Sequence, residues 1–140
     1  MKIKVSELEG VALDWAVAKA EGLMLGQIAI EGVKNGFYNP TTNWAQGGPI
    51  IEREKITIVC AEGEYNYDKA GTPDCYDTYW VAEIGMQQHS TVYGSQGDNW
   101  GDCFRIYTDE MTGPTPLIAA MRCYCRAKLG PEIEVPEEVL

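Results

Sequence analysis

The chain has 140 residues, the usual size of one folded domain, and 45% of them are hydrophobic, which is enough to form a core. Twenty-one acidic residues against eleven basic ones give a formal net charge of −10, so the average surface field repels nucleic acid and anionic lipid. No apolar run approaches the ~20 residues of a membrane span and the N-terminus lacks a signal-peptide core, so we expect a soluble protein that stays inside a cell, without direct nucleic-acid or membrane binding.

A helix is predicted near the N-terminus, over residues 7–20, because this stretch is rich in Ala, Leu, Glu and Lys. Ser6 and Glu9 have the spacing of a capping box, in which each side chain bonds the other residue's backbone N–H. Gly10 would cost about 1 kcal/mol relative to Ala inside a helix. A second interpretation therefore stays open, in which residues 6–9 form a separate turn and the helix begins just after Gly10.

The segment that follows carries weaker signals. Residues 27–33 (QIAIEGV) are predicted as a short strand, and residues 35–42 (NGFYNPTT) as turn and loop, because Asn-Gly and Asn-Pro favour turns. The pair Gly47 and Gly48 predicts a flexible bend, after which Pro49 suits the first position of a short helical turn. We therefore expect mostly loop around short elements here.

Strands are predicted in the middle of the chain. Residues 56–60 follow a solvated polar cluster at 52–55 and have the alternation of a half-buried to fully buried strand. Residues 79–84 are rich in aromatic and β-branched side chains, which favours a second strand. A third strand is expected at residues 103–107, and a shorter one at 90–93, within polar stretches that carry Gly and Tyr. These strands predict one small, mostly antiparallel sheet.

The segment GPTPLIAAMRCYCRAKLG predicts a second long helix. Thr115 is a good N-cap, Pro116 suits the first helical position, and Gly130 followed by Pro ends the helix. Residues 131–140 then carry four Glu and two Pro and are expected to lie extended on the surface as an acidic tail. Apolar positions of the helix form a core stripe about 140° wide. They are Leu117, Ile118, Met121, Tyr124, Cys125 and Leu129.

These elements predict the fold class. No repeat, low-complexity tract or linker divides the chain. We expect a single α+β domain over residues 1–140, in which the N-terminal and C-terminal helices pack on the small, mostly antiparallel sheet.

Two regions hold candidate binding residues. The helix start at Thr115 offers free N–H groups to an anion, but its capping signals explain the same residues and are favoured. Arg122 flanks the core stripe, where its guanidinium needs a carboxylate, a backbone carbonyl or a ligand; an ion pair is favoured. Trp44 lies beside the glycine pair, as a binding anchor or as a cover over the core. If both regions meet, one concave site is lined by Trp44, Gln46, Gly47, Thr115 and Arg122.

Catalytic and metal-binding signals are weak. Five Cys without a secretory signal favour reduced thiols, and Cys123 and Cys125 point about 200° apart on a helix, so they do not chelate one ion. His89 and Cys103 can be drawn as a nucleophile pair, but neither lies in a recognisable catalytic turn. The sequence has no Walker loop, dinucleotide fingerprint or HExxH motif. We predict no metal, no cofactor and no catalytic residue, and an enzyme is disfavoured.

Three blocks of the chain carry a resemblance: SELEGVALDWAVAKAEG, NWAQGGPIIEREKI and GPTPLIAAMRCYCRAKLG, which together make up about a third of it. In this order they resemble the phage NinX-like family, small proteins encoded by lambdoid phages and by prophages of enteric bacteria. The resemblance implies a phage or prophage protein that works in the host cytoplasm. It supplies no activity, because the family is one of unknown function without established catalytic residues.

For function, we predict a non-catalytic accessory protein that binds a basic host or phage protein, because strong negative charge steers such a partner and Tyr-bearing loops supply contact area. A narrower version, in which carboxylates gathered on one face mimic nucleic acid, stays open. The alternative is a small-molecule-binding protein or enzyme with a pocket near Thr115 and Arg122. The oligomeric state is also open, and a homodimer follows if a second copy covers the aromatic loops.

Overall fold

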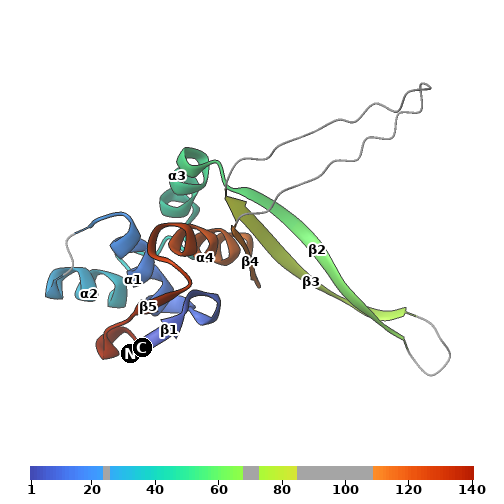
Figure 1. Ribbon diagram of the computed structural model, residues 1–140, viewed down its shortest axis with the longest axis horizontal. Coiled ribbons are helices and arrows are strands. Elements are labelled where there is room, and N and C mark those ends of the chain that lie inside the picture. The colour runs from blue at the N-terminus through green and yellow to red at the C-terminus, as the bar shows by residue number, and fades with distance from the viewer. Residues whose placement is uncertain (24–25, 68–72, 85–108) are drawn as a thin grey trace.

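A computed structural model describes residues 1–23, 26–67, 73–84 and 109–140 (Figure 1). The helices in these ranges are α1 (Gly10–Ala20), α2 (Gln27–Lys34), α3 (Trp44–Glu54) and α4 (Pro116–Leu129). The strands are β1 (Lys2–Lys4), β2 (Thr57–Tyr67), β3 (Pro73–Ile84), β4 (Asp109–Gly113) and β5 (Glu132–Glu134), and the 3-10 turns are η1 (Val5–Glu7) and η2 (Glu137–Val139). The predicted α+β class is confirmed. Within the described ranges, the helices are too short or too polar to cross a membrane.

The strands form two antiparallel sheets. The larger sheet has the order β2-β3-β4, and its register pairs Cys60 with Trp80 and Ala82 with Met111. The small sheet pairs β1 with β5. In Figure 1, β2 and β3 extend away from the helices as a long hairpin. The strands predicted at 56–60 and 79–84 are confirmed, whereas those predicted at 103–107 and 90–93 lie outside the described residues, and β4 was not predicted.

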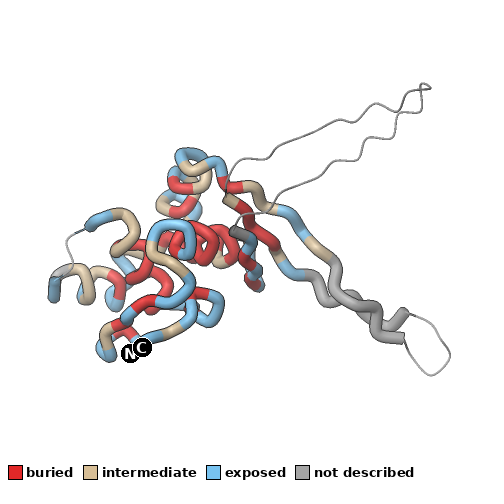
Figure 2. Tube along the Cα trace, in the orientation of Figure 1, coloured by how far each residue is buried: buried red, intermediate tan, exposed pale blue. Residues whose placement is uncertain are grey.

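α4 lies at the centre of the four helices, and Figure 2 shows it as an almost continuous buried segment. It packs on the larger sheet and on α1. The predicted core stripe is confirmed, because its members are buried or half-buried. The buried residues of α4 are Leu117, Ala119, Ala120, Met121, Arg122, Cys123, Tyr124 and Cys125. We refer to the four helices and the small sheet together as the helical body.

The start of α1 decides between the two interpretations of the N-terminal segment. Gly10 is the first residue of α1 and has a φ of +55°, a left-handed conformation that glycine adopts without strain. Glu9 precedes it without a side-chain cap bond, and Ser6 lies in η1. The capping box is therefore wrong, and the alternative of a separate turn before the helix is confirmed.

Residues 27–33 are not a strand but the greater part of α2. Gly26 is the N-cap, and Gly36 follows the helix with a φ of +73°. Ile30 and Val33, three residues apart, both pack on the core, which is the spacing of one helix face. The strand prediction failed because the alternation in QIAIEGV resembles a period of two, while packing against α1 favours the helix.

The bend predicted at Gly47 and Gly48 is also a helix. α3 continues through both glycines and through Pro49, which therefore lies in the helix interior rather than at a first position. Gly47 is required by a close approach: a Cβ there would overlap the carbonyl oxygen of Pro40 and the side chain of Leu117. A glycine needed for packing and a glycine needed for a turn have the same local sequence signal, so the sequence suggested the wrong one.

The C-terminal residues 131–140 are extended in β5 but do not lie simply on the surface. β5 pairs with β1 through Ile133 and Ile3. Over residues 132–135, the charged side chains face solvent and the apolar ones face the core, as the alternation along a strand requires. The surface prediction was wrong for three apolar side chains that are buried, those of Ile133, Val135 and Val139.

Candidate functional site

Two helices begin next to one another. α3 begins at Trp44, and the Asn43 side-chain oxygen accepts a hydrogen bond of 3.0 Å from the backbone N–H two residues further on. α4 begins at Pro116, and Thr115 Oγ1 accepts a hydrogen bond of 3.2 Å from the N–H three residues further on. The predicted cap at Thr115 and the predicted stop at Gly130 are both confirmed.

An open groove of about 240 Å³ lies between these two helix starts. Trp44 borders it with a side chain that is 56% exposed. The groove offers apolar surface with a few hydroxyl groups, and none of its lining residues is charged, so it suits an uncharged or apolar group. We call it the Trp44 groove; it is lined by Thr41, Thr42, Trp44, Thr115, Pro116, Leu117 and Ile118.

Gln46 and Gly47, both predicted as site residues, support the groove instead of lining it. The Gln46 side chain accepts a hydrogen bond of 2.6 Å from the Asn39 N–H and donates one of 2.9 Å to the Phe37 carbonyl. Gly47 lets α3 approach α4. Phe37, in the loop before α3, is 80% exposed and was not predicted as a site residue.

A buried carboxylate anchors one wall of the groove to α1. Asp14 accepts a hydrogen bond of 3.0 Å from the backbone N–H of Thr41, and its side chain is almost fully buried. Burial raises the pKa of Asp14, and the hydrogen bonds with Thr41 oppose that rise only in part. The wall therefore depends on a group whose ionised form is disfavoured by its surroundings.

Arg122, the fifth predicted site residue, does not line the Trp44 groove. Its Nε donates a hydrogen bond of 2.8 Å to the carbonyl of Leu8, and its Nη1 donates one of 2.9 Å to the carbonyl of Thr112. Burial lowers the pKa of Arg122, and the charge of Glu9 opposes this effect. The acceptors are thus backbone carbonyls and not the favoured carboxylate. Of the predicted set, the structure brings Trp44 and Thr115 into one groove and leaves Arg122 outside it.

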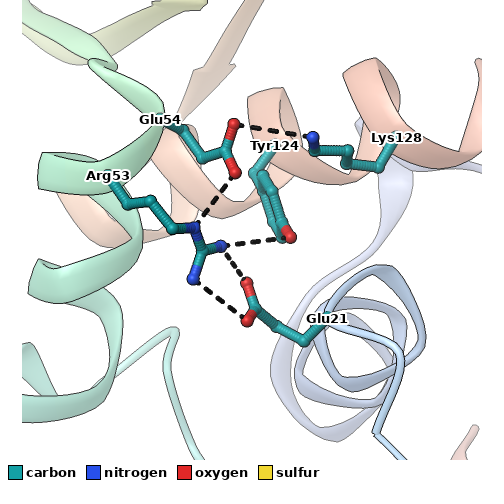
Figure 3. Close-up of polar contacts among 5 residues, drawn as sticks. All are labelled: Glu21, Arg53, Glu54, Tyr124 and Lys128. Atoms are coloured by element: carbon teal, nitrogen blue, oxygen red, sulfur yellow. Dashed lines mark hydrogen bonds and ion pairs between the residues drawn. The ribbon is translucent and has the colours of Figure 1, made fainter.

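A cluster of polar side chains that the sequence did not indicate joins α3 and α4 to the end of α1 (Figure 3). The guanidinium of Arg53 pairs with both carboxylate oxygens of Glu21 and donates from Nε to Glu54 at 3.1 Å. The Tyr124 hydroxyl accepts from Arg53 at 3.3 Å, and Lys128 Nζ lies 3.6 Å from Glu54. Residues 52–55 were expected to be merely solvated, but Arg53 and Glu54 bind partners from α1 and α4.

The charges of this Arg53 cluster compensate one another. Burial alone would raise the pKa of Glu21, but the hydrogen bonds with Arg53 and Tyr124 and the charges of Arg53 and Lys128 together outweigh it, so the pKa lies below its ordinary value. Burial and the neighbouring Glu21 raise the pKa of Tyr124. An ionised carboxylate and a firmly protonated tyrosine are poorly placed to exchange protons near neutral pH. The cluster therefore acts as a tie between helices.

Two of the cysteines belong to the core. Cys123 and Cys125 are buried in α4, and burial raises the pKa of the Cys125 thiol, which disfavours the nucleophilic thiolate. Over residues 1–23, 26–67, 73–84 and 109–140, no three His, Cys, Asp or Glu side chains gather where they could hold a metal ion. The pair His89 and Cys103 lies outside the described residues.

Charge is distributed unevenly along the chain. α4 carries three basic residues and no acidic one. Residues 61–110 contain ten acidic residues and two basic ones, a balance of −8 out of the formal net charge of −10. The three strands of the larger sheet carry seven acidic residues and no Lys or Arg. These seven are Glu62, Glu64, Asp74, Asp77, Glu83, Asp109 and Glu110.

Part of the chain matches a known protein family. The family model described as "Bacteriophage P22, NinX" matches residues 4–94. The first two sequence blocks quoted above lie inside this range, and the block in α4 lies beyond it. A search among curated proteins finds no significant match to the chain.

Proposed function

The chain belongs to the bacteriophage P22 NinX family, and on that basis we propose that it is a phage accessory protein that acts by binding a basic host or phage protein. It works in the host cytoplasm as a non-catalytic binding module. The family is one of phage proteins of unknown function, so the proposal depends on the charge and surface of this chain.

The observation that carries the proposal is the charge of the larger sheet. Its three strands hold seven acidic residues, of which Glu83 is buried, and no Lys or Arg, whereas residues outside 61–110 hold eleven acidic and nine basic residues. Charge of one sign concentrated in one element attracts an oppositely charged protein and speeds their encounter. β2 alone has 11 residues, a span of about 35 Å at the usual rise of a strand. The hairpin of β2 and β3, the acidic hairpin, extends this charge away from the helical body (Figure 1).

The base of the hairpin adds apolar contact area. Val59 and Tyr79 are 39% and 38% exposed. The register pairs Val59 with Val81 and Ala61 with Tyr79, so these side chains share the face opposite to Ala82, which belongs to the core. Apolar and aromatic surface bordered by charge is typical of sites where proteins bind one another.

The small-molecule alternative gains less support. Thr115 does line a groove, but its volume of about 240 Å³ lies below the roughly 300–1,000 Å³ of typical ligand pockets. Arg122, the charged residue of that hypothesis, is already hydrogen-bonded to two carbonyls. We therefore favour a protein partner.

Affinity capture from phage-infected cell extract tests the proposed function. The wild-type chain is compared with a hairpin variant, Glu62→Gln, Glu64→Gln, Asp74→Asn and Asp77→Asn. The control variant removes four exposed charges from the helical body instead, through Glu31→Gln, Glu52→Gln, Glu132→Gln and Glu134→Gln, so both variants have the same net charge.

We expect the wild type and the control variant to retain one basic protein in stoichiometric amount and the hairpin variant to lose it. Equal capture by all three would show that the charge of the hairpin is not what the partner recognises. Retention of a partner that is itself acidic would contradict the proposal directly. Light scattering on the same samples reports whether the chain is a homodimer.

A further inference from the structure

A second groove lies at the end of α1 that is remote from the Arg53 cluster. The turn before α1, the first turn of α1 and η2 enclose it, and its volume is about 380 Å³. We call it the N-terminal groove. Its apolar lining consists of Ile3, Leu8, Val11, Ala12, Val139 and Leu140.

The apolar floor of the N-terminal groove is not fully covered by the described chain. Ile3 and Val11 are only half-buried, and Leu140 is 57% exposed. Apolar surface removed from water contributes about 25 cal/mol per Å², so a partner with apolar side chains gains free energy by filling this floor. A contiguous floor of this kind is typical of a docking site for an amphipathic segment.

The charged residues at the rim of the groove indicate that the segment that binds there is positively charged. The polar residues that line the groove are both carboxylates, and no Lys or Arg is among its described lining residues. Arg122 lies nearby, but its guanidinium is bound to two carbonyls, and Lys4 is exposed at the end of β1 without lining the groove. Four exposed carboxylates belong to the lining or to the adjoining turn η2: Glu7, Glu9, Glu137 and Glu138.

We propose that the N-terminal groove is the docking site for a basic amphipathic helix of a partner protein. Apolar side chains one helical turn apart fill the floor, and Lys or Arg side chains beside them pair with Glu7 and Glu9. The inference rests on the proposed function, because it takes the partner to be basic. It adds where a segment of that partner binds, on a surface separate from the acidic hairpin.

The probe for this site is a labelled amphipathic peptide of about four helical turns, built from Leu and Lys, whose binding is followed by fluorescence anisotropy at about 0.15 M salt. Glu7→Gln with Glu9→Gln tests the rim, and Leu140→Ser, alone and with Val11→Ser, tests the floor. The matched control is Glu31→Gln with Glu52→Gln, which removes the same charge from exposed positions on α2 and α3. Thermal unfolding confirms that each variant is folded.

We expect the rim pair and the floor pair each to weaken binding about tenfold, and Leu140→Ser alone to weaken it less. The control pair and the four-residue hairpin variant should bind the peptide within about twofold of the wild type. A peptide in which Ser replaces every Leu should not bind.

Equal binding by the wild type, rim and floor variants would overturn the docking site, as would absence of binding to the wild type. If the hairpin variant alone lost the peptide, the docking site would be wrong while the proposed function stood. If instead the peptide bound as expected but the capture experiment retained no basic protein, the proposed function would be wrong, and the groove would still be shown to bind a basic helix. A dimer in light scattering that Leu140→Ser dissociates would assign the groove to a second copy and also overturn the proposal.

Discussion

The helical body contains both acidic and basic residues, whereas the strands of the larger sheet contain acidic residues and no Lys or Arg. In the body, Arg122 is bound to two backbone carbonyls, and Arg53 to two carboxylates and a tyrosine. The strands of the larger sheet carry seven acidic residues, of which Glu83 is buried, and no Lys or Arg. Charged groups of the body therefore hold the fold together, while the sheet carries an excess of negative charge that attracts a basic partner.

This difference implies that stability and binding can be separated by mutation. Substitutions in the body should change the free energy of unfolding, because its polar groups are partners of one another or of the backbone. Substitutions of the hairpin carboxylates should change binding instead. Variants of the helical body test the effect on stability, and variants of the hairpin test the effect on binding.

Loss of the Arg122 guanidinium should have the largest effect. Arg122→Met keeps an apolar stem but leaves the carbonyls of Leu8 and Thr112 without their charged donor. We expect a loss of about 3 kcal/mol in the free energy of unfolding, measured by urea denaturation. Arg126→Met, an exposed position on the same helix, is the control and should cost less than about 1 kcal/mol. Equal losses would mean that the carbonyl contacts contribute little.

The two adjacent glycines of α3 should respond oppositely to alanine. Gly47→Ala places a methyl group against the backbone carbonyl of Pro40 and the side chain of Leu117 in α4, so α3 must move away from both, and we expect a loss of about 2 kcal/mol. Nothing lies within 4 Å of a Cβ at Gly48, and Gly48→Ala should be neutral or stabilising by up to about 1 kcal/mol. Thermal unfolding of the two variants measures the contrast. A tolerated Gly47→Ala would show that α3 and α4 are less closely packed than described.

The Arg53 cluster should contribute less than Arg122, because solvent screens it. The Arg53 side chain is 50% exposed. We expect Arg53→Met to cost about 1 kcal/mol and the cost to fall at high salt, whereas the cost of Arg122→Met should change little with salt. A cost for Arg53→Met that is independent of salt would show that packing on Tyr124, and not charge, is what the residue supplies.

Two carboxylates should give stability profiles of opposite sign against pH. The native pKa of Asp14 lies above 3.8, so the folded state binds its proton more tightly than the unfolded state, and ionisation costs stability as pH rises past that value. The native pKa of Glu21 lies below 4.5, so its contribution is present above that pH and is lost as pH falls.

Chemical denaturation between about pH 3 and pH 7 compares Asp14→Asn and Glu21→Gln with the wild type. Relative to the wild type, Asp14→Asn should become more favourable as pH rises, while Glu21→Gln should become less favourable. Parallel profiles for the two variants would contradict the pKa directions of both groups.

Those elements whose signals are local could be predicted from the sequence. α4 was predicted with its start and its end, because Thr115, Pro116 and Gly130 act on their own neighbours. β2 and β3 were likewise predicted from alternation and β-branched content. α3 was missed because the need for Gly47 is set by its close approach to the backbone of Pro40 and the side chain of Leu117, which the sequence does not show.

The candidate site shows the same limit. Trp44 and Thr115 were expected to share a concave site and do line one groove. The acceptors of Arg122 could not be predicted, since Leu8 is 114 residues away along the chain. The N-terminal groove was also not predictable, because it forms only when residues at opposite ends of the sequence meet. Local signals such as helix caps can be predicted from the sequence, whereas contacts between distant segments cannot.

The most direct test of the account is the affinity of the captured basic partner for three proteins, measured by titration calorimetry: the wild type, the hairpin variant and the helical-body control variant. We expect the hairpin variant to bind about tenfold more weakly or worse while its free energy of unfolding changes by less than about 0.5 kcal/mol, and the control variant to bind like the wild type. Equal weakening by both variants would show that only the net charge matters and would contradict a recognition role for the acidic hairpin.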